Sequence, residues 1–209
     1  MRDRNHACVV AWSLLNEPET TDPHARPYLE AVFARARALD PQRRPCTYAG
    51  LMSAQPGRDT CVDLCDVVSL NRYYGWYVFG GFELADAEAA LRTELDKWAE
   101  LGLDRPFLFT EYGADTLETH KLPSVMWSEE YQAEFLEMTH RVFDAYDFVV
   151  GEQVWAFADF ATGEGILRAD GNRKGVFTRQ RQPKTAAHWL RRRWTDQTKR
   201  TGGAAADNV

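Results

Sequence analysis

Two glutamates, each placed directly after a short apolar stretch, are the strongest candidates for chemistry in this sequence. Glu17 lies in an Asn-Glu-Pro motif that follows residues 9–15, and Glu111 lies in a Thr-Glu-Tyr-Gly motif that follows residues 107–109. If both stretches are parallel strands of one β/α barrel, both carboxyl groups lie at the rim where barrel enzymes carry their active sites. Two carboxyl groups that face one glycosidic bond can hydrolyse it, one by donating a proton and the other by attacking the sugar or activating water.

The elements that would position these glutamates can be predicted from hydrophobic periodicity. Short runs rich in branched and aromatic residues are typical of buried strands, and they occur at 9–15, 46–49, 67–70, 107–110 and 149–157. Apolar stripes at helical spacing lie between them, in residues 28–39, 91–98 and 131–142. Ser128 is placed to cap the third helix, because two glutamates follow it at the positive end of the helix dipole. The alternation predicts an α/β fold with a parallel sheet, in which about five β/α units form part of a (β/α)8 TIM barrel.

Other polar and aromatic residues also fall where the predicted strands end, so they would share one rim with the glutamates. These residues are Asn16 after the first strand, Asn71, Tyr73 and Tyr77 after the third, Tyr112 after the fourth, and Trp155 and Asp159 at the end of the fifth. Core packing is as good an interpretation of Trp155 as stacking on a sugar. Trp76 and Trp127 lie in predicted loops, where exposed aromatic rings would form a carbohydrate platform or cover the barrel end.

Composition excludes several classes of function. A chain of 209 residues with 44% hydrophobic residues can bury a sizeable core, and a net charge of −6 argues against a nucleic-acid partner. No run of about 18 apolar residues predicts a membrane span, and the start of the chain lacks the apolar core of a secretion signal. We therefore expect a cytoplasmic protein with a small-molecule partner.

The cysteines and histidines do not predict a metal site. Cys8 and Cys46 lie in or beside apolar runs, where buried reduced thiols are ordinary. Cys61 and Cys65 lie in a more polar stretch, but no second Cys/His pair nearby would complete four ligands. The five histidines are scattered, so we expect neither a metal nor a cofactor.

Several motifs together resemble the catalytic barrel of the β-glucuronidases in glycoside hydrolase family 2. The resemblance covers residues 2–194 and is strongest at 9–18 (VVAWSLLNEP), 71–77 (NRYYGWY), 109–115 (FTEYGAD), 126–131 (MWSEEY), 151–160 (GEQVWAFADF) and 165–175 (GILRADGNRKG). It implies a retaining hydrolase of β-D-glucuronides that acts by double displacement, with Glu17 as general acid/base and Glu111 as nucleophile. Asn16 would then contact the sugar beside the reacting centre. Donors such as Tyr73 or Asn71 would keep Glu111 ionised.

Selection of a glucuronide requires donors for the carboxylate of the sugar. The resemblance assigns this role to Asn172 and Lys174, with help from Arg168. From composition alone, the same loop would be a solvated basic turn. A β-galactosidase-like hydrolase, which binds a neutral sugar, would have no reason to place these donors here, so this loop separates the two readings.

The resemblance also implies that the chain is a fragment. Members of this family are about three times as long, and this chain would hold barrel strands four to eight in a truncated TIM-barrel domain (1–194) followed by a flexible tail (195–209). An open sheet exposes unpaired strand edges. Either a complementing chain or a homo-oligomer covers them, or the fragment keeps the catalytic residues without the scaffold that aligns them. A non-catalytic carbohydrate-binding fragment, and an inert fragment, remain the alternatives to a hydrolase.

Overall fold

The computed structural model describes residues 2–3, 5–118 and 123–196. They form two compact units. The first comprises the chain up to Gly113 together with Met138–Trp155, and the second comprises Ala114–Glu137 together with the chain from Ala156. Residues 197–209 of the predicted tail lie outside the described residues. None of the described helices is both long and apolar enough to cross a bilayer.

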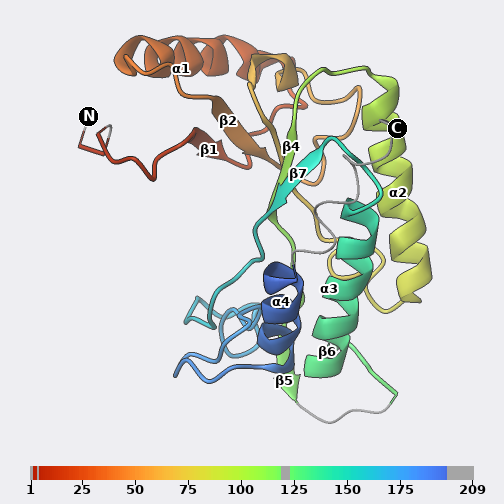
Figure 1. The fold of residues 1–209 in the computed structure, drawn as a ribbon. Helices are drawn as coiled ribbons and strands as arrows, with labels where there is room; N and C mark the ends of the chain where they lie inside the picture. The colour runs from red at the N-terminus through yellow and green to blue at the C-terminus, as the bar shows by residue number, and fades with distance from the viewer. Residues whose placement is uncertain (1, 4, 119–122, 197–209) are drawn as a thin grey trace, which may run out of the picture. The chain divides into compact units, whose positions relative to one another are not determined.

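The first unit is built on a five-stranded parallel sheet with the strand order β1-β2-β3-β4-β7 (Figure 1). The strands are β1 (Trp12–Asn16), β2 (Cys46–Gly50), β3 (Val68–Asn71), β4 (Phe107–Glu111) and β7 (Val149–Glu152). All five strands predicted from the sequence are therefore present, and the predicted α/β fold is confirmed. Within the described residues, β1 pairs only with β2 and β7 only with β4, so the sheet is open.

The described residues also contain four α-helices and several short elements. They are η1 (Pro23–Ala25), α1 (Arg26–Leu39), η2 (Val62–Leu64), α2 (Leu84–Glu100), β5 (Thr116–Glu118), β6 (Trp127–Ser128), α3 (Glu129–Phe143) and α4 (Thr185–Thr195). Helix α3 begins in the second unit and ends in the first. The parallel pair β5–β6 and helix α4 belong to the second unit.

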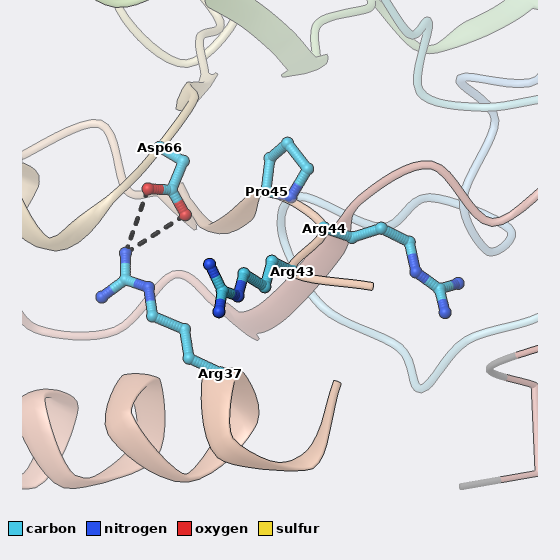
Figure 2. A pocket seen from close by; sticks show the side chains of 5 residues that line it. All are labelled: Arg37, Arg43, Arg44, Pro45 and Asp66. Carbon is cyan, nitrogen blue, oxygen red and sulfur yellow. Dashed lines mark hydrogen bonds and ion pairs between the residues drawn. The ribbon is translucent and has the colours of Figure 1, made fainter. Parts of the chain in front are cut away.

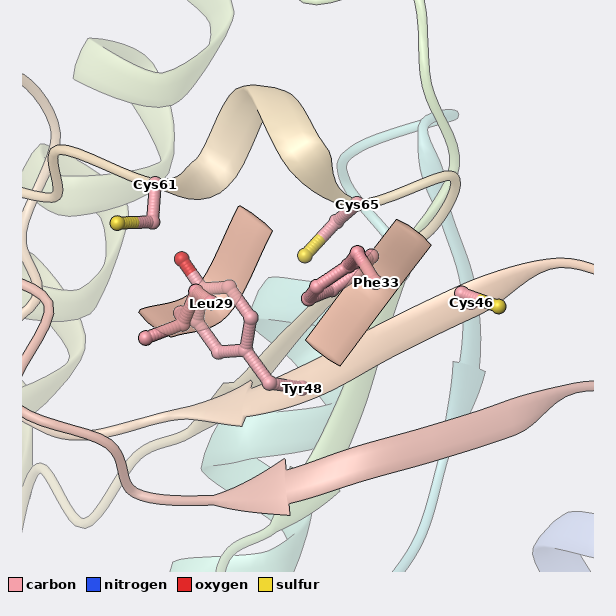
Figure 3. Close-up of a cluster of buried hydrophobic side chains, with 6 residues drawn as sticks. All are labelled: Leu29, Phe33, Cys46, Tyr48, Cys61 and Cys65. Atoms are coloured by element: carbon pink, nitrogen blue, oxygen red, sulfur yellow. The ribbon is translucent and has the colours of Figure 1, made fainter. Parts of the chain in front are cut away.

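Helix α1 packs on β1 and β2, and its apolar stripe faces β2. Leu29 and Phe33 lie one turn apart and are both buried, and the Phe33 ring meets the Tyr48 ring edge-on with 6.2 Å between centroids (Figure 3). Burial of each such side chain contributes roughly 1.5–3 kcal/mol. The helix ends at Leu39 and the next residue, Asp40, is extended, because the proline that follows disfavours a helical conformation there.

Three of the four thiols are buried around this cluster. Cys46, Cys61 and Cys65 are inaccessible, and burial raises the pKa of Cys65 to about 12, so its thiol stays protonated and behaves as a small apolar group. Cys8 contradicts our expectation of a buried thiol. It is exposed because β1 begins only at Trp12, so the preceding residues are not part of the sheet.

The other two predicted helices are also present. The buried residues of α2 include Leu91, Leu95 and Trp98, and the predicted stripe of α3 is buried from Tyr131 to Val142. The predicted cap is confirmed, since Ser128 Oγ accepts a hydrogen bond from the backbone N–H of Tyr131 at 3.1 Å.

The structure corrects the end of one predicted strand and adds one helix. The fifth strand was expected to reach residue 157 but ends at Glu152, because the ladder with β4 stops there. The sequence analysis did not predict α4, whose buried residues are only Ala186 and Leu190 on an otherwise polar helix.

Candidate active site

Both candidate glutamates lie at the carboxyl ends of strands of the same sheet. Glu17 directly follows β1, and its backbone N–H donates to Ala49 O of the neighbouring strand at 2.8 Å. Glu111 is the last residue of β4. Glu17 has a φ of 51°, in the left-handed region that few residues other than glycine adopt. Strained backbone of this kind clusters at functional sites.

Asn71, the last residue of β3, connects the two strand ends. Its side chain has no solvent exposure. The amide nitrogen donates to Glu17 Oε1 at 3.0 Å and to Asn16 Oδ1 at 3.2 Å. The amide oxygen accepts from Thr110 Oγ1, the residue before Glu111, at 2.7 Å. This buried amide is thus hydrogen-bonded to Glu17 through its nitrogen and to Thr110 of β4 through its oxygen, so it fixes the position of the Glu17 carboxyl group relative to β4.

Tyr73 holds the second glutamate. Its hydroxyl group donates to Glu111 Oε2 at 2.8 Å, so the expected contact between these residues is present, whereas Asn71 contacts Glu17 instead. Burial raises the pKa of Tyr73 far above its usual range, and the negative charges of Glu111 and, more weakly, Glu17 raise it further. The phenol therefore remains a donor at physiological pH and lies within the electrostatic reach of both carboxyl groups. The Tyr77 ring packs on it with 4.9 Å between centroids.

Tyr112, which was expected to share the rim with the glutamates, is instead fully buried, and its polar neighbours His140 and Glu152 were not predicted from the sequence. The Tyr112 hydroxyl lies 2.6 Å from His140 Nε2, which lies 3.5 Å from Glu152 Oε1. Glu152 is the last residue of β7, and Glu17 and Glu111 also lie at strand ends. This position at a strand end could have identified Glu152 as a candidate site residue. It was overlooked because the predicted strand continued past Glu152 to residue 157.

Two aromatic residues proposed for sugar binding differ in their surroundings. Trp155 is half-buried, and its backbone N–H donates to Tyr112 O at 3.0 Å. Trp76 was expected to be exposed, but only 6% of its surface is accessible. It packs beside Tyr77 in the turn after β3, with 6.5 Å between ring centroids, and therefore offers no exposed platform.

The predicted carboxylate-binding residues lie in the second unit. Lys174 forms an ion pair with Asp115, and neither side chain has any solvent exposure. Asn172 is also buried, and its Oδ1 accepts from the backbone N–H of Lys174 at 3.1 Å. Arg168 is half-buried, and its Nη1 donates to Leu167 O at 2.8 Å. Residues 171–175 are therefore structured and largely buried, in contrast to the interpretation as a solvated basic turn.

Asp159 belongs to the framework of this loop. Its Oδ1 accepts from Lys184 Nζ at 2.7 Å and from the backbone N–H of Gly175 at 3.0 Å. The backbone N–H of Arg173 donates to Asp115 Oδ1 at 2.7 Å. The two buried aspartates thus hold both sides of the Lys174 segment.

The predicted site residues are divided between the two units. The first unit brings together Asn16, Glu17, Asn71, Tyr73, Tyr77 and Glu111 and also contains Trp155, whereas the second unit contains Arg168, Asn172 and Lys174.

A cavity of about 490 Å³ lies elsewhere in the first unit, at the amino end of β2 (Figure 2). It is lined by Arg37, Arg43, Arg44, Pro45 and Asp66. Arg37 pairs with Asp66 there at 3.1 Å, and none of the predicted site residues lines this cavity. The described residues contain no group of three or more side chains suited to hold a metal ion.

Comparisons with known proteins identify the family. Residues 1–198 match the family described as glycosyl hydrolases family 2, TIM barrel domain. The β-glucuronidase of Streptococcus agalactiae is 48% identical over 194 residues, which are 92% of this chain and 32% of that protein. The human β-glucuronidase is 42% identical over 197 residues, which are 92% of this chain and 29% of that protein.

Solved structures agree with the sequence comparisons. The β-glucuronidase of Ruminococcus gnavus is 56% identical and superposes with a TM-score of 0.90 over 92% of this chain and 33% of that one. The enzyme of Lactobacillus rhamnosus is 53% identical, with a TM-score of 0.91 over 93% of this chain and 33% of that one. The chain thus spans about a third of the length of its relatives. It belongs to glycosyl hydrolase family 2, as a part of the TIM-barrel domain homologous to the catalytic barrel of β-glucuronidases.

Proposed function

We propose that this chain carries the two catalytic carboxyl groups of a retaining β-glucuronidase, with Glu17 as general acid/base and Glu111 as nucleophile. The observation that carries the proposal is the pair of contacts from one strand end, Asn71 to Glu17 and Tyr73 to Glu111. Asn71 at the end of β3 and Tyr73 two residues later thus contact the glutamates at the ends of β1 and β4. A retaining mechanism requires the carboxyl groups to lie about 5–5.5 Å apart.

The different contacts of the two carboxyl groups support different catalytic roles for them. Because Glu17 Oε1 accepts the amide N–H of Asn71, the proton for the leaving group would reside on Oε2. The Tyr73 hydroxyl stabilises the carboxylate form of Glu111, which attacks the anomeric carbon and forms a covalent glycosyl-enzyme. Glu17, now deprotonated, then takes a proton from water, which attacks the anomeric carbon and releases Glu111. The chemistry requires only two carboxyl groups and water.

The substrate proposed is a β-D-glucuronide. In support, the relatives named above are β-glucuronidases, and the Ruminococcus gnavus enzyme has been solved in complex with D-glucuronic acid and with D-glucaro 1,5-lactone. Asn172, Lys174 and Arg168 would bind the sugar carboxylate. Since Lys174 already pairs with Asp115, an incoming carboxylate would share the ammonium group, which has three donors. Asn16, Tyr77 and Trp155 would line the sugar site.

The proposed partners follow from the open sheet. Since β1 and β7 each pair with one strand only within the described residues, we propose that turnover requires a complementing chain or a homo-oligomer that covers the strand edges.

The test is release of a chromogenic aglycone from a β-glucuronide, compared with the corresponding β-galactoside. Glu17→Gln should lower the rate roughly 10²–10⁴-fold because the proton donor is lost. Glu111→Gln should abolish turnover because an amide cannot serve as the nucleophile. Glu19→Gln is the matched control, because it removes an exposed carboxyl group two residues after Glu17 and should leave the rate unchanged.

A binding measurement with D-glucaro 1,5-lactone distinguishes the remaining outcomes. Binding without hydrolysis would support a non-catalytic carbohydrate-binding chain. Neither binding nor a cooperative thermal transition would indicate an inert fragment. Unchanged hydrolysis by Glu111→Gln would refute the nucleophile assignment.

A further inference from the structure

We propose that Arg72 is a positioning residue for both glutamates, acting with Glu94 to fix the end of β3 that carries Asn71 and Tyr73. The catalytic part of this inference rests on the proposed function. Arg72 lies between Asn71, which contacts Glu17, and Tyr73, which contacts Glu111. Any displacement of this residue would therefore move both contacts.

The strand pair at this point is irregular. In the register between β3 and β4, Leu70 faces Phe109 and Asn71 faces Glu111, so Thr110 is an extra residue. The backbone N–H of Arg72 closes the irregularity by donating to Glu111 O at 2.8 Å. Irregularities of this kind re-aim side chains and interrupt the ladder, so the strand end needs support from elsewhere.

The guanidinium group of Arg72 supplies that support from the loop after β2. Its Nη1 donates to Gly50 O at 3.0 Å, to Leu51 O at 2.9 Å and to Asn71 O at 2.9 Å. Its Nη2 donates to Ala54 O at 2.8 Å. The loop that follows β2 is thus tied to the end of β3.

Glu94 provides the second attachment, from helix α2. The Arg72 Nε lies 2.8 Å from Glu94 Oε1, Nη2 lies 2.7 Å from the same oxygen, and each side chain is only 1% exposed. The carboxylate is itself fixed by Trp98 Nε1 at 2.9 Å and by Gln55 Nε2 at 3.3 Å. The planar guanidinium therefore has a single orientation, set by a strand, a loop and a helix at once.

This arrangement fits positioning better than stabilisation alone. A buried ion pair is weak evidence for net stability, because desolvation of both charges offsets their attraction. A rigid five-donor group that satisfies carbonyl groups of the strand end and of the neighbouring loop after β2 does fix geometry. A lysine keeps the charge but cannot reproduce the planar set of donors, so Arg72→Lys isolates the geometric contribution.

Arg105→Lys is the matched control. Arg105 also uses a guanidinium to satisfy loop carbonyl groups, with Nη1 donating to Val62 O at 3.1 Å and to Asp63 O at 2.8 Å. It lies just before β4 and therefore at the opposite end of the strands from Glu17 and Glu111. Its replacement removes a comparable set of contacts without touching the proposed site.

The experiment compares wild type, Arg72→Lys, Glu94→Gln and Arg105→Lys by two measurements. The first is the pair of side-chain amide resonances of Asn71 in ¹H–¹⁵N spectra, which report the contacts of its N–H groups with Glu17 and Asn16. The second is the rate of β-glucuronide hydrolysis. We expect Arg72→Lys and Glu94→Gln to shift the Asn71 resonances and to lower kcat on the order of 100-fold, as a displacement of about 1 Å can do, with KM little changed. Arg105→Lys should change neither.

The two measurements separate the outcomes. Wild-type Asn71 resonances in a folded Arg72→Lys or Glu94→Gln variant would overturn the inference, as would an equal shift in Arg105→Lys. If wild type does not hydrolyse the glucuronide even when a chain that completes the barrel is supplied, the proposed function fails, and the Asn71 resonances still decide whether Arg72 positions the site. If Arg72→Lys does not fold, Glu94→Gln decides, because its amide oxygen can still accept from Arg72.

Discussion

The buried pair of Lys174 and Asp115 leads to a quantitative prediction, because Lys174 is also the proposed reader of the sugar carboxylate. Replacement of Lys174 by methionine keeps an unbranched side chain of similar length in the buried site. It leaves Asp115 with the hydrogen bond from the backbone N–H of Arg173 but without the ammonium group on its other oxygen. A carboxylate with no solvent exposure would then be uncompensated.

The expected cost is large. Removal of one partner of a buried pair destabilises a protein by about 3–5 kcal/mol, a substantial part of a typical total of about 5–15 kcal/mol. At a factor of ten per 1.4 kcal/mol, this shifts the unfolding equilibrium on the order of 100-fold to 4,000-fold. The double variant Lys174→Met/Asp115→Asn should recover most of the loss, because the charge is gone and the new amide oxygen can still accept from Arg173.

Urea unfolding followed by tryptophan fluorescence would measure the four proteins of this cycle. A loss below about 1 kcal/mol in Lys174→Met, or a double variant as unstable as the sum of the single variants, would refute the reasoning. The result also governs how activity data are read, because lost hydrolysis in Lys174→Met reports on substrate binding only where the variant is still folded. Hydrolysis assays should therefore be run below the midpoint temperature of each variant.

Two further predictions concern Asp40, which follows α1, and Gly175, which follows Lys174. Burial opposes ionisation of Asp40, but the backbone N–H of Arg44 and the indole of Trp12 more than offset it and lower the pKa of Asp40 from 3.8 to about 2. The contribution of Asp40 to stability is therefore fully present above pH 3.8 and is lost as the pH falls toward about 2. In the Asp40→Asn variant, the urea midpoint should depend less on pH over this interval. A Cβ atom on Gly175 would lie 2.1 Å from the backbone nitrogen of Asp159, whereas one on Gly163 would meet nothing within 4 Å. In thermal unfolding, Gly175→Ala should therefore be severely destabilised and Gly163→Ala should stay within about 0.5 kcal/mol of wild type, and equal midpoints would contradict the packing argument.

Much of the fold could be predicted from the sequence, because parallel strands buried on both faces are uninterrupted apolar runs. The end of β7 could not, since the apolar residues after Glu152 continue the pattern and only the loss of pairing with β4 ends the strand. Helix α4 was missed because so few of its residues are buried that no full apolar stripe marks it.

The candidate site was predictable only in part, for a related reason. Glu17 and Glu111 adjoin strand ends that are visible in the local sequence. Their supporting contacts join residues far apart in the chain, as Arg72 does with Glu94 and Lys174 does with Asp115. No local pattern distinguishes a buried arginine from an exposed one, so these pairs became visible only in the structure.

The left-handed backbone conformation of Glu17 lowers the stability of the fold, whereas the side chain of the same residue is proposed to act in catalysis. A glycine would relax this position, since it adopts such a φ without steric penalty. The same substitution would delete the carboxyl group to which the acid/base role is assigned. A laboratory selection for thermal stability alone would therefore favour glycine at position 17. A selection for turnover would retain glutamate despite its strained backbone.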